Sequence, residues 1–294
     1  MRKLLVTSVL LAASAALAVA ATATGAGGAT AAKSAIPGCA PDALTLVSDG
    51  ALTIGADNPA FPPWFGGAEK TKPWKVSDPY SGKGYESAVA YSIASQLGFT
   101  KAQVKWTVVP FNNSFRPGKK SFDFYVTQVS FSPERARAVD FSKSYYFVNQ
   151  AVVARKGTPI AKVKSIAGLK RYKLGAQVGT TSYTYITRWI RPSSDPLVYD
   201  TNDAAVQALK NGQLDGIVVD LPTAFYVTAV QVEDGVIVGK LPTKGTKERF
   251  GLVFQKGNTL RGCVNRALDR LWRNGTIKKH QQAYLARAGA PDLK

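Results

Sequence analysis

The segment 122–146, FDFYVTQVSFSPERARAVDFSKSYY, most constrains the fold of this chain. Residues 123–130 alternate apolar and polar side chains and are rich in β-formers, which predicts a strand. The triplet Ser-Pro-Glu at 132–134 is typical of a helix start. Arg135 then falls in the first helical turn, where free N–H groups and partial positive charge disfavour a cation. The pattern predicts either a carboxylate or phosphate receptor at Arg135, or an ion pair of Arg135 with Glu134 or Asp140 and no ligand.

The order of strands and helices predicts the fold class. Apolar runs that read as strands alternate with periodic segments that read as helices, which indicates α/β layers with a largely parallel sheet. We expect strands at 52–57, 104–109, 149–154, 173–177, 214–219 and 248–255, and helices at 84–98, 182–189, from 202 to about 212, and from 260 to about 274.

The segment 130–146, SFSPERARAVDFSKSYY, resembles the signature T-I-T-x-E-R-x-x-x-V-D-F-S-x-P-Y-Y of family 3 extracellular solute-binding proteins. These proteins serve polar amino-acid ABC transporters, and further matches follow in order over about residues 50–290. The resemblance implies a periplasmic-binding-protein-like α/β fold with two lobes, each a mostly parallel sheet flanked by helices, and the ligand in the cleft between them. It also implies that the chain crosses between lobes twice, so that residues 45–148 plus 250–294 form lobe one and 149–249 form lobe two.

The N-terminus indicates export. Arg2 and Lys3 precede an apolar run at 4–20 and small-residue cleavage options, which predicts a signal peptide at 1–32 rather than a membrane anchor. Residues 33–44 read as a leader segment. No other long apolar run exists, so we expect the protein in the periplasm or on the outer face of the cytoplasmic membrane.

The chain is strongly basic, with 38 Lys and Arg against 19 Asp and Glu. Nucleic-acid binding would fit such a charge, but export and the scattered cations argue against it. Attraction to an anionic envelope and a merely solvated basic surface both stay open.

The two cysteines, Cys39 and Cys263, suggest one disulfide in an exported chain. The alternative, a lipidated Cys39, has only the poor lipobox Ile-Pro-Gly-Cys to support it. No metal-ligand cluster, P-loop or nucleophile elbow is present, and His280 is the single histidine, so we expect no cofactor and no enzyme.

Candidate ligand-binding residues stand where strands end, because ligands of open α/β sheets bind beyond the carboxyl ends of the strands. An α-amino acid needs a cationic fork and an anionic acceptor, which Arg135 and Asp220 can supply; the resemblance implies the same two roles. It also implies that three aromatic rings enclose the ligand's aliphatic part and that Asp57 meets a polar or cationic side chain. Ordinary core packing and a strand-end turn are the alternatives for those residues. The full set is Asp57, Phe61, Trp64, Phe111, Thr127, Gln128, Ser130, Arg135, Gln177, Gly179, Thr181 and Asp220.

Two departures from the family pattern bear on specificity. Gln128 stands where a small residue is common, so its amide can narrow the pocket or bind the ligand. The segment 112–120 carries Lys and Arg that can disfavour cationic ligands, opposite to the effect of Asp57.

The resemblance therefore implies a monomeric exported protein that captures a polar amino acid and delivers it to a membrane permease, without nucleic acid. One alternative is a lyase similar to cyclohexadienyl or arogenate dehydratases, which share this fold. Those enzymes carry a glutamate shortly after a Gly-Gly-Thr turn, where this chain has Thr181-Ser182-Tyr183. The other alternative is an envelope-associated sensor or adhesin.

Overall fold

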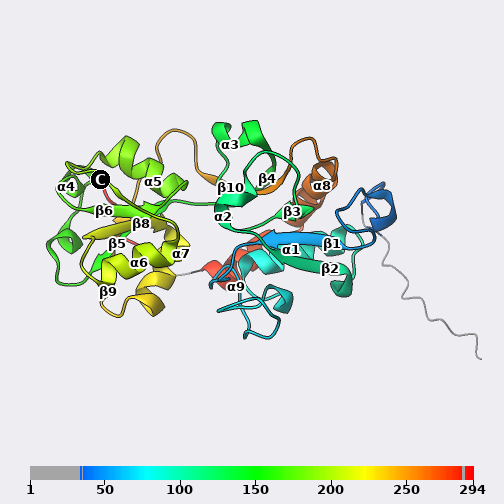
Figure 1. Cartoon of the computed structure of the whole chain (residues 1–294), viewed down its shortest axis with the longest axis horizontal. Helices are drawn as coiled ribbons and strands as arrows, with labels where there is room; N and C mark the ends of the chain where they lie inside the picture. The colour runs from blue at the N-terminus through cyan, green and yellow to red at the C-terminus, as the bar shows by residue number, and fades with distance from the viewer. Residues whose placement is uncertain (1–33, 35, 287–288) are drawn as a thin grey trace, which may run out of the picture. The chain divides into compact units, whose positions relative to one another are not determined.

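The computed structural model describes residues 34, 36–286 and 289–294 (Figure 1). The predicted signal peptide at 1–32 lies outside the described residues. No helix in the described ranges is both long and apolar enough to cross a bilayer.

Lobe one is built on a five-stranded sheet in the order β2-β1-β3-β10-β4. Its strands are β1 (Leu52–Ala56), β2 (Val104–Val108), β3 (Phe124–Tyr125), β4 (Val139–Phe147) and β10 (Arg249–Gln255). The main core of this lobe joins the sheet to α1 (Tyr85–Gln96), α8 (Leu260–Arg273) and α9 (Thr276–Leu285). A smaller apolar cluster includes residues around α2 (Phe111–Ser114) and α3 (Pro133–Ala138).

Lobe two is built on a second five-stranded sheet in the order β7-β6-β8-β5-β9. Its strands are β5 (Gln150–Arg155), β6 (Leu174–Gln177), β7 (Leu197–Tyr199), β8 (Gly216–Asp220) and β9 (Gly235–Lys240). Val152 and Val218 face a core with α4 (Ile166–Leu169), α5 (Thr181–Tyr185) and the π-helical segment Ile186–Ile190. Their neighbours Val153 and Val219 face another core with α6 (Asn202–Lys210), α7 (Leu221–Tyr226) and the π-helical segment Val227–Gln231. The central strands β5 and β8 are therefore mostly apolar, because both of their faces are buried.

Short 3₁₀ helices complete the described chain at Pro41–Ala43, Pro79–Ser81, Lys101–Gln103 and Pro159–Lys162.

The two-lobed α/β fold is confirmed, but both sheets are mixed rather than mostly parallel. In lobe one, β1 pairs in parallel with β2 and β3, whereas β10 pairs antiparallel with β3 and β4. Lobe two repeats this pattern, with β5 antiparallel to β8 and β9. The antiparallel pairs arise because the chain passes between the sheets directly, from β4 to β5 and from β9 to β10, without a crossover helix.

The predicted lobe limits, 45–148 plus 250–294 and 149–249, stay our proposal except at the chain end. Leu293 is buried in the core of lobe two, and its backbone N–H donates to Lys240 O at 2.9 Å. The Lys240 ammonium lies 2.9 Å from an Asp292 carboxylate oxygen. The final residues therefore belong with lobe two.

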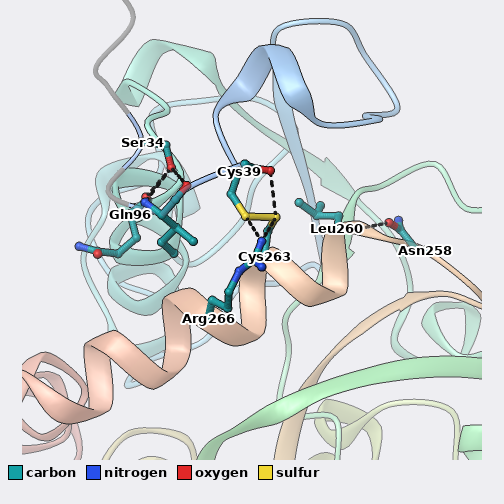
Figure 2. Close-up of a disulfide and its surroundings, with 9 residues drawn as sticks. Ser34, Cys39, Gln96, Asn258, Leu260, Cys263 and Arg266 are labelled. Atoms are coloured by element: carbon teal, nitrogen blue, oxygen red, sulfur yellow. Dashed lines mark hydrogen bonds between the residues drawn. A yellow bond between two sulfur atoms is a disulfide. The ribbon is translucent and has the colours of Figure 1, made fainter.

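The predicted disulfide is confirmed. Cys39 and Cys263 are bonded and join the start of the described chain to α8 across 224 residues of sequence (Figure 2). Cys39 is fully buried in the core of lobe one, which ties the leader segment to that core.

Candidate functional site

A cavity lined by both lobes lies where β1, β6 and β8 end and where α5 and α6 begin. Its lining residues are Asp57, Asn58, Pro59, Phe61, Phe65, Phe111, Thr127, Gln128, Ser130, Arg135, Gln177, Thr180, Thr181, Ser182, Thr201, Asn202, Asp203, Val219, Asp220 and Thr223. This is the position expected for the ligand site of an open α/β sheet.

Arg135 projects into the cavity from α3. The Ser132 side chain caps this helix by accepting from the Arg135 backbone N–H at 3.2 Å. The Arg135 guanidinium donates to Ser130 O and, in lobe two, to Gly179 O, both at 2.6 Å. It also stacks 4.4 Å from the centre of the Phe115 ring. These contacts fix the guanidinium but use only neutral acceptors.

Arg135 forms no ion pair within the described residues. The alternative prediction, that a neighbouring acid pairs with Arg135 in place of a ligand, is therefore wrong. Asp140 pairs instead with Lys256, at 3.1 Å. Burial lowers the pKa of Arg135 to about 10, against the opposing influence of the Glu248 and Asp220 charges. The side chain is therefore cationic at neutral pH and has no neutralising partner, which is the condition for binding an anion.

Asp220 ends β8 in lobe two and faces the same cavity. The Gln150 side-chain amide donates to its Oδ1 at 2.6 Å. Burial raises the pKa of Asp220 well above its usual value, and the charge of Glu248 raises it further. A bound cation would relieve both effects, so this carboxylate is suited to an ammonium group.

The other predicted site residues divide into two groups. Asp57, Phe61, Phe111, Thr127, Gln128, Ser130, Gln177 and Thr181 line the cavity with Arg135 and Asp220. Trp64 does not, because its ring packs in the core of lobe one with Tyr146 and Phe250. Gly179 also lies outside the lining and contributes its carbonyl to Arg135.

Gln128 links the lobes. Its backbone has a φ of 48°, a left-handed conformation three residues after the end of β3. The Gln128 Oε1 accepts from the Thr223 hydroxyl at 2.9 Å, and the same hydroxyl accepts from Trp64 Nε1 at 3.1 Å. The large side chain at this position therefore forms part of an interlobe contact.

The basic segment 112–120 does not supply a cation to the cavity. None of its residues is among the lining residues, and Lys120 directs its ammonium to the carbonyls of Asn113 and Arg116. The sequence left open whether the cations of this segment disfavour a cationic ligand, opposite to the effect of Asp57. Because these cations lie outside the cavity lining, we expect no such effect from them.

Sequence reasoning missed Glu248, which joins the two lobes behind Arg135. Its Oε1 accepts from the hydroxyls of Ser130 and Thr181, both at 2.5 Å. Its Oε2 accepts from Gln150 Nε2 at 3.0 Å. Glu248 is the first residue of the expected strand 248–255 and follows the polar run Lys-Gly-Thr-Lys, so no local signal marks it as a site residue.

Sequence reasoning also missed Asp203 at the start of α6. An acid in the first turn of a helix is common, so the sequence gives no reason to single out Asp203. Only the folded structure shows that Asp203 lines the cavity. Within the described ranges, no group of three or more His, Cys, Asp or Glu side chains is arranged to hold a metal ion.

Comparison with known proteins places this geometry in a family. Residues 65–287 match the model of the bacterial extracellular solute-binding proteins, family 3. The chain is 27% identical over 257 residues to the L-arginine-binding protein of Pseudomonas aeruginosa, covering 82% of this chain and 90% of that protein.

Two solved structures extend the comparison. An ancestral arginine-binding protein bound to arginine superposes with a TM-score of 0.65 at 28% identity, covering 81% of this chain and 99% of that one. An ancestral amino acid-binding protein, described as a precursor of cyclohexadienyl dehydratase, has a TM-score of 0.65 at 25% identity, covering 81% and 96%. The family match spans most of this chain, and the chain therefore belongs to the bacterial extracellular solute-binding proteins of family 3.

Proposed function

We propose that this protein is the exported substrate-binding component of an ABC importer and that its ligand is a polar α-amino acid. In this proposal Arg135 holds the α-carboxylate and Asp220 holds the α-ammonium. One observation carries it: a cation from lobe one and an anion from lobe two face one cavity, and neither forms an ion pair with any residue that the structure describes. The names of amino-acid-binding relatives support the same ligand class.

Capture would proceed by closure of the two lobes about the paired crossings at β4–β5 and β9–β10. A zwitterion bridges Arg135 and Asp220, so its binding energy favours the closed form. The hydrogen bonds from Thr223 to Gln128 and from Ser130 to Glu248 also span the lobes. A membrane permease would then recognise the closed surface, with no covalent step in the binding protein. Monomeric state and the absence of nucleic-acid binding stay predictions.

Thermal unfolding with added amino acids tests the proposal. The protein is first unfolded and refolded to remove any copurified ligand, then heated with each of the twenty amino acids. A ligand present at about a hundred times its Kd adds about 2.7 kcal/mol to the free energy of unfolding. We expect one or a few polar amino acids to raise the Tm.

Two arginine variants make this test specific. Arg135→Ala removes the carboxylate receptor and should abolish the ligand-induced rise in Tm. Arg137→Ala is the matched control, because Arg137 lies on the same helix but is exposed. A wild-type response in Arg135→Ala, or no response of the wild type to any amino acid, would refute the proposed function.

A dehydratase-like activity has less support. The relatives described above are named as binding proteins, and the Thr181-Ser182-Tyr183 segment offers no carboxylic acid. Formation of phenylpyruvate from prephenate by the purified protein would nevertheless overturn the assignment to binding alone.

A further inference from the structure

The sheet of lobe two separates the charges of that lobe. Residues 141–194 contain ten Lys and Arg but no Asp or Glu. The helices of this segment, α4, α5 and Ile186–Ile190, cover one face of the sheet, whereas α6, α7 and Val227–Gln231 cover the other (Figure 1). The second layer, residues 200–212 and 221–234, carries a single cation, Lys210, and the acids Asp200, Asp203, Glu233 and Asp234. One layer of lobe two is therefore basic and the other is acidic.

Six exposed cations lie on the basic layer, and we call them the basic face: Lys162, Lys164, Lys170, Arg171, Arg188 and Arg191. Val163, Leu169 and Ile190, which are close to these cations in sequence, are buried together in one core of lobe two. The Ser193 N–H also donates to Lys170 O at 2.7 Å and joins the end of α4 to the chain that follows the π-helical segment. The cations therefore surround a single core, although they are spread along the sequence.

No acid in the described residues forms an ion pair with the basic face. The contacts of its cations are neutral: Arg191 Nε donates to Arg188 O at 3.0 Å, and the Arg171 guanidinium lies 5.2 Å from the centre of the Tyr172 ring. A merely solvated surface would carry acids interspersed among the cations. Cations gathered on one side repel one another and create a positive potential, which attracts an anionic surface.

Exposed apolar side chains adjoin the basic face in sequence. Trp189 lies between Arg188 and Arg191 and is 44% exposed. Leu197 and Val198, on the edge strand β7 that follows, are 42% and 45% exposed. Trp and aliphatic side chains beside Lys and Arg can enter the headgroup region of a bilayer, whereas a dissolved anion would leave them in water. The combination therefore fits a phospholipid surface better than a soluble polyanion.

We propose that the basic face docks on an anionic phospholipid bilayer and holds the protein at the membrane surface. The Cys39 sulfur is bonded to Cys263 and is not available to carry a lipid, so attraction to the headgroups supplies the retention instead. Contact through lobe two alone leaves lobe one free to move during closure. The inference rests on the proposed export of the protein, but not on its amino-acid ligand.

Sedimentation of the protein with lipid vesicles, in the absence of any amino acid, tests the inference. One set of vesicles contains only phosphatidylcholine, and the other contains equal parts of phosphatidylcholine and phosphatidylglycerol. We expect the protein to bind the mixed vesicles and not the neutral ones. Binding to the mixed vesicles should weaken as the salt concentration rises, because salt screens the charges on both surfaces.

A triple variant assigns the binding to the basic face. Each Lys or Arg close to an anionic bilayer strengthens binding about fivefold. The variant that combines Lys164→Gln, Lys170→Gln and Arg171→Gln should therefore bind the mixed vesicles at least about 30-fold more weakly than the wild type.

A second triple variant is the matched control. It combines Arg273→Gln, Lys278→Gln and Lys279→Gln, which removes the same charge from exposed positions of lobe one. We expect it to weaken vesicle binding less than about fivefold, because these positions are not part of the basic face. Both variants replace exposed side chains, so their midpoints of urea unfolding should match that of the wild type.

Three results would overturn the inference. Equal losses of affinity in the two triple variants would show that net charge, and not the basic face, determines binding. Equal binding to neutral and mixed vesicles, or no binding to either, would remove the anionic bilayer as the partner. Tighter binding to a double-stranded oligonucleotide than to the mixed vesicles would make a nucleic acid the partner. None of these results bears on amino-acid binding, which the thermal unfolding experiment tests separately.

Discussion

Glu86 is a fully buried carboxyl group that contacts Gln128, one of the residues that line the cavity. Its Oε1 accepts from the Gln128 N–H at 2.6 Å and from the Tyr145 hydroxyl. Its Oε2 is buried with no hydrogen-bond partner in the described residues. Burial raises the pKa of Glu86 from 4.5 to about 7, although both hydrogen bonds lower it. The protonated form is therefore favoured in the folded protein.

The difference between the pKa of Glu86 in the folded and unfolded states sets the size and sign of its effect on the free energy of unfolding. Each pKa unit corresponds to about 1.4 kcal/mol, so the rise from 4.5 to about 7 corresponds to about 3 kcal/mol. Between these two values the folded state holds a proton that the unfolded state has lost. The free energy of unfolding therefore falls as pH rises through this window, and the loss is complete above about pH 7.

The variant Glu86→Gln isolates this contribution, because a neutral amide reproduces the protonated carboxyl at every pH. We expect the variant to match the wild type near about pH 4.5 and to exceed it by about 3 kcal/mol above about pH 7. Urea unfolding of both proteins across this pH range measures the difference. Glu233→Gln, which removes an exposed carboxylate, serves as the control and should show no such trend. A constant difference between Glu86→Gln and the wild type at all pH values would refute the reasoning.

Three other features give predictions. Gly84→Ala should lower the free energy of unfolding by more than about 2 kcal/mol, because the added Cβ would lie 2.4 Å from Phe65 Cα and the backbone φ of Gly84 is 89°. Gly262→Ala is the control, because Gly262 lies in a helix with open space around it, and this variant should be neutral or stabilising in the same urea titration. Removal of the disulfide by Cys39→Ser with Cys263→Ser should cost about 2–5 kcal/mol, measured by urea unfolding against the oxidised wild type, and an unchanged midpoint would contradict its stabilising role. Glu248→Gln should extend ligand binding to lower pH, because the Glu248 charge helps to raise the pKa of Asp220 and ligand affinity falls as Asp220 becomes protonated. Measuring the Kd of the ligand as a function of pH tests this, and the same pH dependence in the variant and the wild type would contradict it.

The parts of the site that sequence could predict are those encoded locally. The Ser-Pro-Glu triplet at 132–134 does begin a helix, and Arg135 does face a cavity, because a cap and a first turn depend on neighbours in sequence. Glu248 and Asp203 could not be predicted, because their importance comes from groups on other elements. Trp64 lies in an aromatic loop whose sequence is equally compatible with core and cleft.

The limits of the strands also separate features that the local sequence encodes from features that depend on other parts of the fold. The expected strand 123–130 is reduced to Phe124–Tyr125, and the left-handed backbone at Gln128 separates it from an isolated bridge between Ser130 and Phe250. The strand β7 was not predicted, since its Leu197 and Val198 side chains are exposed and give no burial pattern. Local alternation identifies a strand best where one or both faces are buried.

The central claim is that Arg135 and Asp220 recognise the two charged ends of an α-amino acid. Isothermal titration tests it most directly, using the best-bound amino acid and two derivatives of it. One derivative lacks the α-carboxyl group, and the other carries an acetylated α-amine. We predict that each change weakens binding at least about 100-fold, since each leaves one buried charge without its partner. If either derivative binds as tightly as the parent amino acid, the proposed zwitterion site is wrong.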